Sequence, residues 1–269
     1  MEIQPMTGAL GAEIHGVDLS AKLGENVVAS IRAALWEHQL LVFRNQKLSI
    51  EQHKAFAQYF GPLHVHPYIA ARPIDDAHPE VLRVVKEKDD RKVFGEKWHS
   101  DVTFLEKPVL GSALYAIDTP PKGGDTLFAN MYLAYEALSD TLKGLLEQLT
   151  GVHETAVPEI DPVTKLTIQP MRLENKRGEH PVIKVHPETG KKLLYVNTTY
   201  TTHFKGMTVE ESKPLLDYLC QHAVKGEFLT RVRWAPGTLT FWDNRSTQHL
   251  PINDYHGHRR EMHRITIET

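Results

Sequence analysis

The hydrophobic and polar positions of the chain follow a helical period near the N-terminus. The apolar residues that share this spacing are Val27, Val28, Ile31, Ala34 and Leu35. A second helix is predicted to begin at Ser49-Ile50-Glu51-Gln52, which has the capping-box pattern ahead of Phe56, Ala57 and Phe60. Between the two helices, Leu40-Leu41-Val42-Phe43 predicts a short buried strand.

From about Val81 onward the pattern changes to short apolar runs bounded by Pro, Gly, Asn and Asp, which are typical of strands. The predicted strands span residues 81–85, 111–117, 182–185, 193–196, 228–234, 238–242 and 264–267. Pro236-Gly237 separates two of them and predicts a hairpin turn. Helices are expected at residues 133–149 and 208–222, and the second opens with the capping box Thr208-Val209-Glu210-Glu211.

Residues 153–181 differ from the rest because they are Pro-rich and polar without clear periodicity. A loop of that length in a compact domain is usually a lid or a binding segment, so we expect an active-site lid there. No repeat, low-complexity tract or charge block divides the chain, and a single domain over residues 1–269 is the expectation. Many short strands with flanking helices predict a mainly β fold with a double-stranded β-helix (jelly-roll) core, in which two sheets enclose a pocket.

Composition narrows the class of partner. Of the 269 residues, 41% are hydrophobic, enough to bury a core. The formal net charge of -3, from well-mixed acidic and basic residues, argues against nucleic-acid binding. No segment approaches the roughly 20 consecutive apolar residues that cross a bilayer, and the N-terminus lacks a basic region followed by an apolar stretch. We therefore expect a cytoplasmic protein without a membrane partner.

The cysteine and histidine content limits the kinds of metal site. Cys220 is the only cysteine, which excludes an internal disulfide and thiolate-rich metal centres. The chain has 16 histidines. Imidazole and carboxylate are therefore the expected ligands, and they suit iron, manganese or zinc.

The first candidate ligands are His99 and Asp101, within Trp98-His99-Ser100-Asp101. In an extended segment, residues two apart share a face, so both side chains could converge on one ion. Such a pair also occurs by chance, with His99 as a hydrogen-bonded residue and Asp101 as a turn former. A third candidate is His249, which follows Phe241-Trp242-Asp243-Asn244-Arg245 and precedes two arginines, Arg260 and Arg264.

Together these residues make a more specific pattern. Two imidazoles and one carboxylate on one face of iron leave three open positions, as in non-haem iron oxygenases. Two of them could chelate a 2-oxo acid and the third could take dioxygen. If this 2-oxo acid is a dicarboxylate, its far carboxylate needs a partner as well. An arginine guanidinium group matches a carboxylate with two parallel hydrogen bonds.

The sequence resembles the taurine dioxygenase family, which also includes phenoxyacetate-herbicide dioxygenases and oxidative alkylsulfatases. The segments that carry the resemblance follow the family's order over nearly the whole chain. They are Phe60-Gly61-Pro62-Leu63-His64-Val65-His66-Pro67, Trp98-His99-Ser100-Asp101-Val102-Thr103-Phe104, Gly123-Gly124-Asp125-Thr126, Trp242-Asp243-Asn244-Arg245 with His249, and Arg259-Arg260 with His263-Arg264.

The resemblance implies a role for each matching residue. Iron(II) would be bound by His99, Asp101 and His249, and the distal carboxylate of 2-oxoglutarate by Thr126 and Arg260. The anionic head of the substrate would face His66 and Arg264, with a pocket wall formed by Val102, Phe104 and Tyr200. Taken alone, Thr126 reads as an ordinary strand residue, Arg259 is as good a candidate as Arg260, and the wall residues read equally well as core packing.

The implied reaction is hydroxylation of a small organic anion, coupled to decarboxylation of 2-oxoglutarate to succinate with dioxygen as the oxidant. An alkyl sulfate or sulfonate is favoured and an aryloxyalkanoate is next. Taurine is expected to be a poor substrate, because taurine-specific relatives place tyrosine and asparagine where this chain has Ile69 and Gly95. Family members are often dimers or tetramers, so a homo-oligomer is expected.

Two other classes stay open. A zinc or manganese hydrolase could use the same His99, Asp101 and His249 set to activate water. It would need a general base, for which Glu106 and Glu154 are available, and would have no use for Thr126 or Arg260. A catalytically silent binding protein on the same scaffold is the other alternative.

Overall fold

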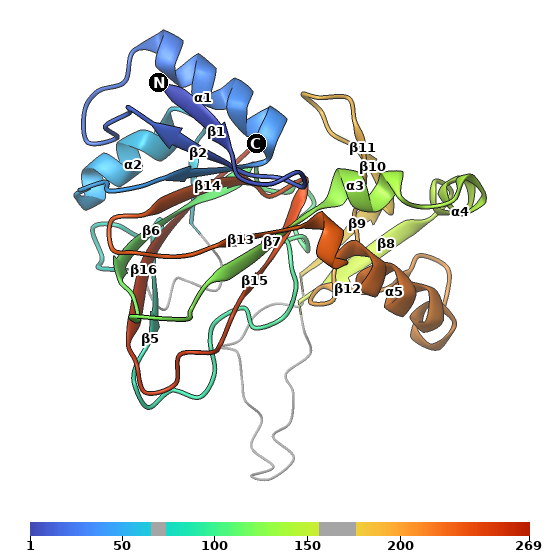
Figure 1. Ribbon diagram of the computed structural model, residues 1–269. Helices are drawn as coiled ribbons and strands as arrows, with labels where there is room; N and C mark the ends of the chain where they lie inside the picture. The colour runs from blue at the N-terminus through green and yellow to red at the C-terminus, as the bar shows by residue number, and fades with distance from the viewer. Residues whose placement is uncertain (66–73, 156–175) are drawn as a thin grey trace.

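Two facing sheets form the centre of the computed structural model, which describes residues 1–65, 74–155 and 176–269 (Figure 1). The larger sheet has the order β1 (Glu2–Pro5), β2 (Ala12–His15), β3 (Leu40–Phe43), β14 (Leu239–Asp243), β6 (Gly111–Asp118), β16 (Arg260–Ile267) and β4 (Leu63–His64), and β5 (Val81–Lys86) also pairs with β16. The smaller sheet has the order β13 (Leu229–Val232), β7 (Thr126–Asn130) and β15 (Thr247–Pro251). Phe128 of β7 packs against Trp242 of β14 with ring centroids 5.4 Å apart, so the two sheets share an interior. The predicted mainly β architecture is confirmed.

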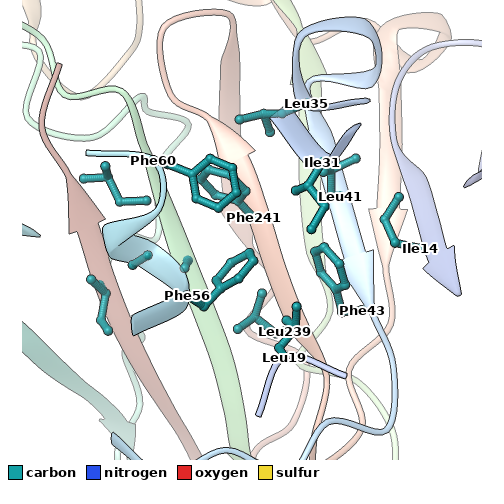
Figure 2. Packing of buried hydrophobic residues seen from close by; sticks show 14 of the residues in the cluster. Ile14, Leu19, Ile31, Leu35, Leu41, Phe43, Phe56, Phe60, Leu239 and Phe241 are labelled. Carbon is teal, nitrogen blue, oxygen red and sulfur yellow. The ribbon is translucent and has the colours of Figure 1, made fainter. Parts of the chain in front are cut away.

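The larger sheet is covered on its outer face by helices α1 (Glu25–His38) and α2 (Ile50–Gln58), as Figure 1 shows. Figure 2 shows the core between the helices and the sheet. The centroid of the Phe56 ring lies 5.7 Å from those of both Phe43 and Phe241. The alternate residues of β3, Leu40 and Val42, belong to the core on the opposite face of the strand. Since both faces of β3 are buried, its four residues form one apolar run, as predicted.

The helix predictions hold at their N-termini. The capping boxes at Ser49 and Thr208 both form, and they open α2 and α5 (Val209–Ala223). The single helix expected over residues 133–149 is wrong, because the structure has α3 (Met131–Glu136) and α4 (Asp140–Leu146) instead. The break occurs where Ser139 accepts a hydrogen bond from the backbone N–H of Leu142 and starts a new helix.

The hairpin predicted at Pro236-Gly237 is also wrong. The turn forms, but β13 pairs with β7 whereas β14 pairs with β3 and β6. The turn therefore carries the chain from one sheet to the other. Gly237 has φ +81°, and a Cβ there would lie 2.6 Å from the carbonyl oxygen of Gln46, so the corner requires glycine.

The loop predicted over residues 153–181 is wrong at both ends. Strands β8 (Thr150–Glu154) and β9 (Arg177–Pro181) pair there, and β12 (Thr201–Phe204) completes a third sheet. The inward positions of β9 are Gly178 and His180 rather than apolar residues, which hid the strand from a hydrophobic pattern. The remainder of that stretch, 156–175, lies outside the described residues.

The remaining elements are short. Strands β10 (Ile183–Val185) and β11 (Lys192–Leu194) form a two-stranded sheet, and the 3-10 helix η1 (Gly226–Phe228) precedes β13. Among the helices that the structure describes, none is long and apolar enough to cross a membrane.

Candidate active site

The two candidate histidines are brought together by the backbone. The His99 N–H donates to the His249 carbonyl at 3.2 Å, and the His249 N–H donates to the His99 carbonyl at 2.8 Å. This bridge joins the segment before Asp101 to β15 and leaves the ring centroids 4.2 Å apart. Nε2 of His99 lies 3.8 Å from Oδ1 of Asp101. One ligand atom from each of the three buried side chains lies within 4.8 Å of the others, a spacing that could hold a metal ion.

The surroundings of both rings favour the neutral imidazole, which is the form that binds metal. Nδ1 of His99 donates to the Lys97 carbonyl at 2.7 Å, which leaves the Nε2 lone pair on the side of Asp101. Burial lowers the pKa of His99, and burial together with the nearby His99 ring lowers the pKa of His249 to about 3. Neutral imidazoles beside one carboxylate match the donor set of a non-haem iron site.

Asp101 is held through its carboxylate and its backbone. Ser112 on β6 donates to Oδ2 at 3.1 Å, and Arg264 on β16 donates from Nη1 to Oδ1 at 2.8 Å. The Asn244 side chain accepts from the Asp101 N–H at 2.6 Å and donates to the Asp101 carbonyl at 2.9 Å. The carboxylate thus has a fixed position before any ligand arrives. Its neighbour Val102 has φ +48°, a left-handed conformation that is rare for a β-branched residue.

Asn244 and Ser112 are site residues that sequence reasoning missed. Asn244 stands inside the Trp242-Asp243-Asn244-Arg245 motif, so the signal was present but its role was not. Its neighbours in that motif act elsewhere. The Asp243 carboxylate accepts from Nε2 of His186 at 2.8 Å and from Nη2 of Arg245 at 2.9 Å, in a buried network.

The predicted wall residues lie together beside the metal ligands. Val102 and Phe104 belong to one buried cluster against which Tyr200 packs. The Tyr200 ring centroid is 5.2 Å from Phe104 and 6.5 Å from His99. The segment that carries the wall is fixed by His180 on β9, whose Nε2 lies 2.9 Å from the Thr103 carbonyl. A role in contacting substrate stays a prediction, and His66 lies outside the described residues.

Thr126 and Arg260 both contact the indole ring of Trp234. Nε1 of Trp234 donates to the Thr126 hydroxyl at 3.0 Å, and the Arg260 guanidinium lies 5.6 Å from the centroid of the same ring. Arg260 is buried, and its Nε and Nη2 have no hydrogen-bond partner in the part of the chain that the structure describes. Burial lowers the pKa of Arg260, although a hydrogen bond with Tyr255 opposes this effect. A buried guanidinium with free donors fits a carboxylate ligand.

The Gly123-Gly124 pair determines how the chain packs beside Arg260. Gly123 and Gly124 have φ +77° and +70°, and a Cβ on Gly123 would lie 2.5 Å from Oδ1 of Asp254. That same oxygen accepts from the Gly124 N–H at 2.7 Å. The turn therefore packs tightly on the Asp254-Tyr255 segment and brings Tyr255 beside Arg260.

Arg259 and Arg260, equal candidates by sequence, differ clearly in the structure. Arg259 is partly exposed and pairs with Glu261, Glu87 and Asp118. Arg260 is buried at the start of β16 and points to Trp234. Of these two arginines, Arg260 is the one with unpartnered buried nitrogens among the described residues, and its binding of a cosubstrate stays a prediction.

Arg264, predicted to face the substrate, has one nitrogen on Asp101. Its Nε and Nη2 are buried and have no partner among residues 1–65, 74–155 and 176–269. Those two donors lie on the same guanidinium that contacts a candidate metal ligand. The role of Arg264 toward substrate stays a prediction.

Comparison with known proteins decides the class of this site. The family model described as taurine catabolism dioxygenase TauD, TfdA family matches residues 2–266. The chain belongs to this family. An alkylsulfatase of Acinetobacter baylyi is 35% identical over 99% of this chain and 84% of its own length. An alpha-ketoglutarate-dependent sulfate ester dioxygenase of Pseudomonas putida is 34% identical over 99% of this chain and 89% of its own length.

Solved structures agree with the family assignment. The crystal structure of a taurine dioxygenase from Burkholderia xenovorans is 37% identical, covers 99% of this chain and 89% of the other, and superposes with a TM-score of 0.83. The predicted jelly-roll fold is confirmed by this likeness. So is the predicted enzyme class, an iron(II)- and 2-oxoglutarate-dependent dioxygenase that uses dioxygen. The hydrolase alternative finds no support.

Proposed function

We propose that this TauD-family enzyme hydroxylates a small organic anion, coupled to decarboxylation of 2-oxoglutarate to succinate, with an alkyl sulfate or alkanesulfonate as the favoured substrate. An aryloxyalkanoate is the next choice. The observation that carries the proposal is the buried cluster of His99, Asp101 and His249, with the free donors of Arg264 beside it. The relatives that are named for sulfate esters support the substrate class.

Different side chains of the site bind the metal, the cosubstrate and the substrate. We assign His99, Asp101 and His249 to iron(II), which supplies the redox chemistry that activates dioxygen. Asn244 and Ser112 keep Asp101 oriented, so the ligand geometry does not depend on the metal. Thr126 and Arg260 bind the distal carboxylate of 2-oxoglutarate. Arg264 orients the anionic head of the substrate with its two remaining donors.

One solved relative is named a taurine dioxygenase, so the names of relatives give no reason to disfavour taurine as the substrate. The expectation that taurine is a poor substrate rests on the residues of the site. Gly95 has φ +76°, and a Cβ there would lie 2.8 Å from Cε1 of His99. No side chain fits at this position without moving the ring. The site therefore has no polar group at residue 95 to pair with an ammonium, and an unpaired buried ammonium is rejected. Ile69, the other departure, lies outside the described residues.

Succinate release under air with added iron(II) tests the proposal. A medium-chain alkyl sulfate should stimulate succinate formation well above the rate with taurine or without substrate. Release of sulfate without consumption of 2-oxoglutarate would indicate the hydrolase instead. A clear preference for taurine would show that the pocket is assigned to the wrong substrate.

Arg264 is tested separately, because it also touches Asp101. Arg264→Lys keeps the positive charge but removes the planar set of guanidinium donors. We expect KM for the alkyl sulfate to rise while metal affinity changes little. Titration with manganese(II) under anaerobic conditions provides the metal control. Unchanged KM would remove Arg264 from the substrate site.

A further inference from the structure

Lys86 is a buried lysine that has no ionic partner among the residues that the structure describes. It ends strand β5, its side chain is 3% exposed, and its Nζ has no hydrogen-bond partner within the described parts of the chain. Its contact is with the face of Tyr255, 4.7 Å from the ring centroid. A cation–π contact compensates only part of the cost of removing an ammonium from water.

The position of Lys86 in the sheet places it next to a second buried cation. In the antiparallel pairing of β5 with β16, Lys86 lies directly opposite Arg260. Directly opposed residues point to the same face of a sheet, and like charges there repel. Both cations contact Tyr255. Asp125 acts electrostatically on Arg260, but no carboxylate among the described residues hydrogen-bonds Nζ of Lys86 or Nε and Nη2 of Arg260. The described parts of the chain therefore place two buried cationic side chains side by side with free donors on both.

We propose that Lys86 and Arg260 together bind the distal carboxylate of 2-oxoglutarate, as a two-cation subsite. This inference rests on the proposed function, which assigns Arg260 to that carboxylate. A carboxylate has two oxygens, so one can accept from the Lys86 ammonium and the other from Nε or Nη2 of Arg260. Tyr255 aligns the two donors, since it contacts both.

The subsite makes a specific demand on the cosubstrate. A 2-oxo acid that lacks the distal carboxylate leaves both cations unpaired, and the site should reject it more strongly than a site with arginine alone. A neutral residue at position 86 should reduce this discrimination. It should also relieve the repulsion in the ligand-free protein.

The test is a calorimetric titration of the manganese(II)-loaded enzyme without oxygen, with 2-oxoglutarate and with 2-oxopentanoate, which lacks the distal carboxylate. Lys86→Met should weaken 2-oxoglutarate binding by about tenfold or more and leave 2-oxopentanoate unchanged, because one charge-assisted hydrogen bond is lost. Lys86→Arg should retain most of the affinity. Thermal unfolding of ligand-free Lys86→Met should show an unchanged or higher Tm than that of the unaltered enzyme.

The chain offers a matched control in Lys184, on β10. Its Nζ lies 4.4 Å from the centroid of Tyr195, so it makes the same kind of contact outside the 2-oxoglutarate pocket. Lys184→Met should bind both 2-oxo acids like the unaltered enzyme. An equal loss in Lys184→Met and Lys86→Met would overturn the proposal.

The remaining outcomes separate this inference from the proposed function. If Arg260→Ala weakens 2-oxoglutarate binding and Lys86→Met does not, Lys86 is a structural residue and the proposal fails while the function stands. If neither variant affects 2-oxoglutarate binding, the pocket itself is assigned wrongly. Should Lys86→Met not fold, Lys86→Gln takes its place in the same titrations.

Discussion

The metal cluster of His99, Asp101 and His249 and the subsite proposed for the 2-oxoglutarate carboxylate, here called the carboxylate pocket (Lys86, Arg260 and Tyr255), are both buried and polar, but they balance their charges differently. At the metal cluster, the Asp101 carboxylate is matched by Arg264 and the two imidazoles are neutral. In the carboxylate pocket, Nζ of Lys86 and Nε and Nη2 of Arg260 have no hydrogen-bond partner among the described residues, and the two side chains lie opposite one another. The first region is therefore complete as the chain folds, whereas we propose that the second is completed by its ligand. Binding of 2-oxoglutarate should accordingly stabilise the fold.

The largest expected effect is at the metal cluster. His99→Ala, Asp101→Ala and His249→Ala should each abolish iron-dependent succinate formation, because two protein ligands do not maintain the site. Manganese(II) titration should show the matching loss of metal affinity. Full activity in any one of the three variants would remove that residue from the triad.

The same three variants should differ in stability. Asp101→Ala leaves Arg264 buried and unpaired, and should lower the free energy of unfolding by about 3–5 kcal/mol. Denaturant unfolding without metal checks the ranking, with the histidine variants less affected. Equal losses in all three variants would contradict the claim that the cluster is charge-balanced.

In the carboxylate pocket the order should reverse, with a large effect on binding and a small one on folding. Arg260→Ala should weaken 2-oxoglutarate binding by about 2–5 kcal/mol, because it removes one side of a buried charge-assisted pair. Arg259→Ala, which affects only partly exposed ion pairs, should change binding little and stability by about 1 kcal/mol or less. If the two variants rank the other way, the wrong arginine has been assigned.

A smaller effect is expected for Asn244, which acts on the metal only through Asp101. Asn244→Ala should reduce metal affinity by about 10–100-fold, the range typical of residues that orient ligands. Thr240→Val on β14, the strand that ends one residue before Asn244, is the control, because it removes a buried hydroxyl with no partner among the described residues. Equal affinities in both variants would mean that Asp101 is held well enough without the amide.

Much of this molecule follows from sequence because local signals were decisive. Capping boxes predicted two helix starts, and the apolar run of β3 predicted a short buried strand. The hairpin at Pro236-Gly237 failed because a turn motif specifies the backbone of the turn and not the strands that pair afterwards. Strand β9 was missed because its buried positions are not apolar.

The site shows the same limit. The resemblance pointed to His99, Asp101 and His249, which the structure brings together, and to Arg260, which lies buried in the carboxylate pocket. It gave no reason to select Lys86 or Tyr255, which are ordinary residues in sequence. Their importance depends on a cross-strand register and on a glycine turn that packs against a distant segment. Long-range pairing of this kind has no local signature.

The left-handed backbone at Val102 bears on how this enzyme would respond to laboratory evolution. A β-branched residue in that conformation costs of order 1–3 kcal/mol, which glycine would recover. Glycine would also remove an apolar side chain from the wall beside Asp101. Val102 is fully buried, so the packing and chain entropy that glycine loses offset the strain that it relieves. Selection for heat resistance alone should therefore gain little from glycine at this position, and selection for turnover of a chosen substrate should keep valine. The strained backbone is expected to persist in evolved variants because the wall needs the side chain.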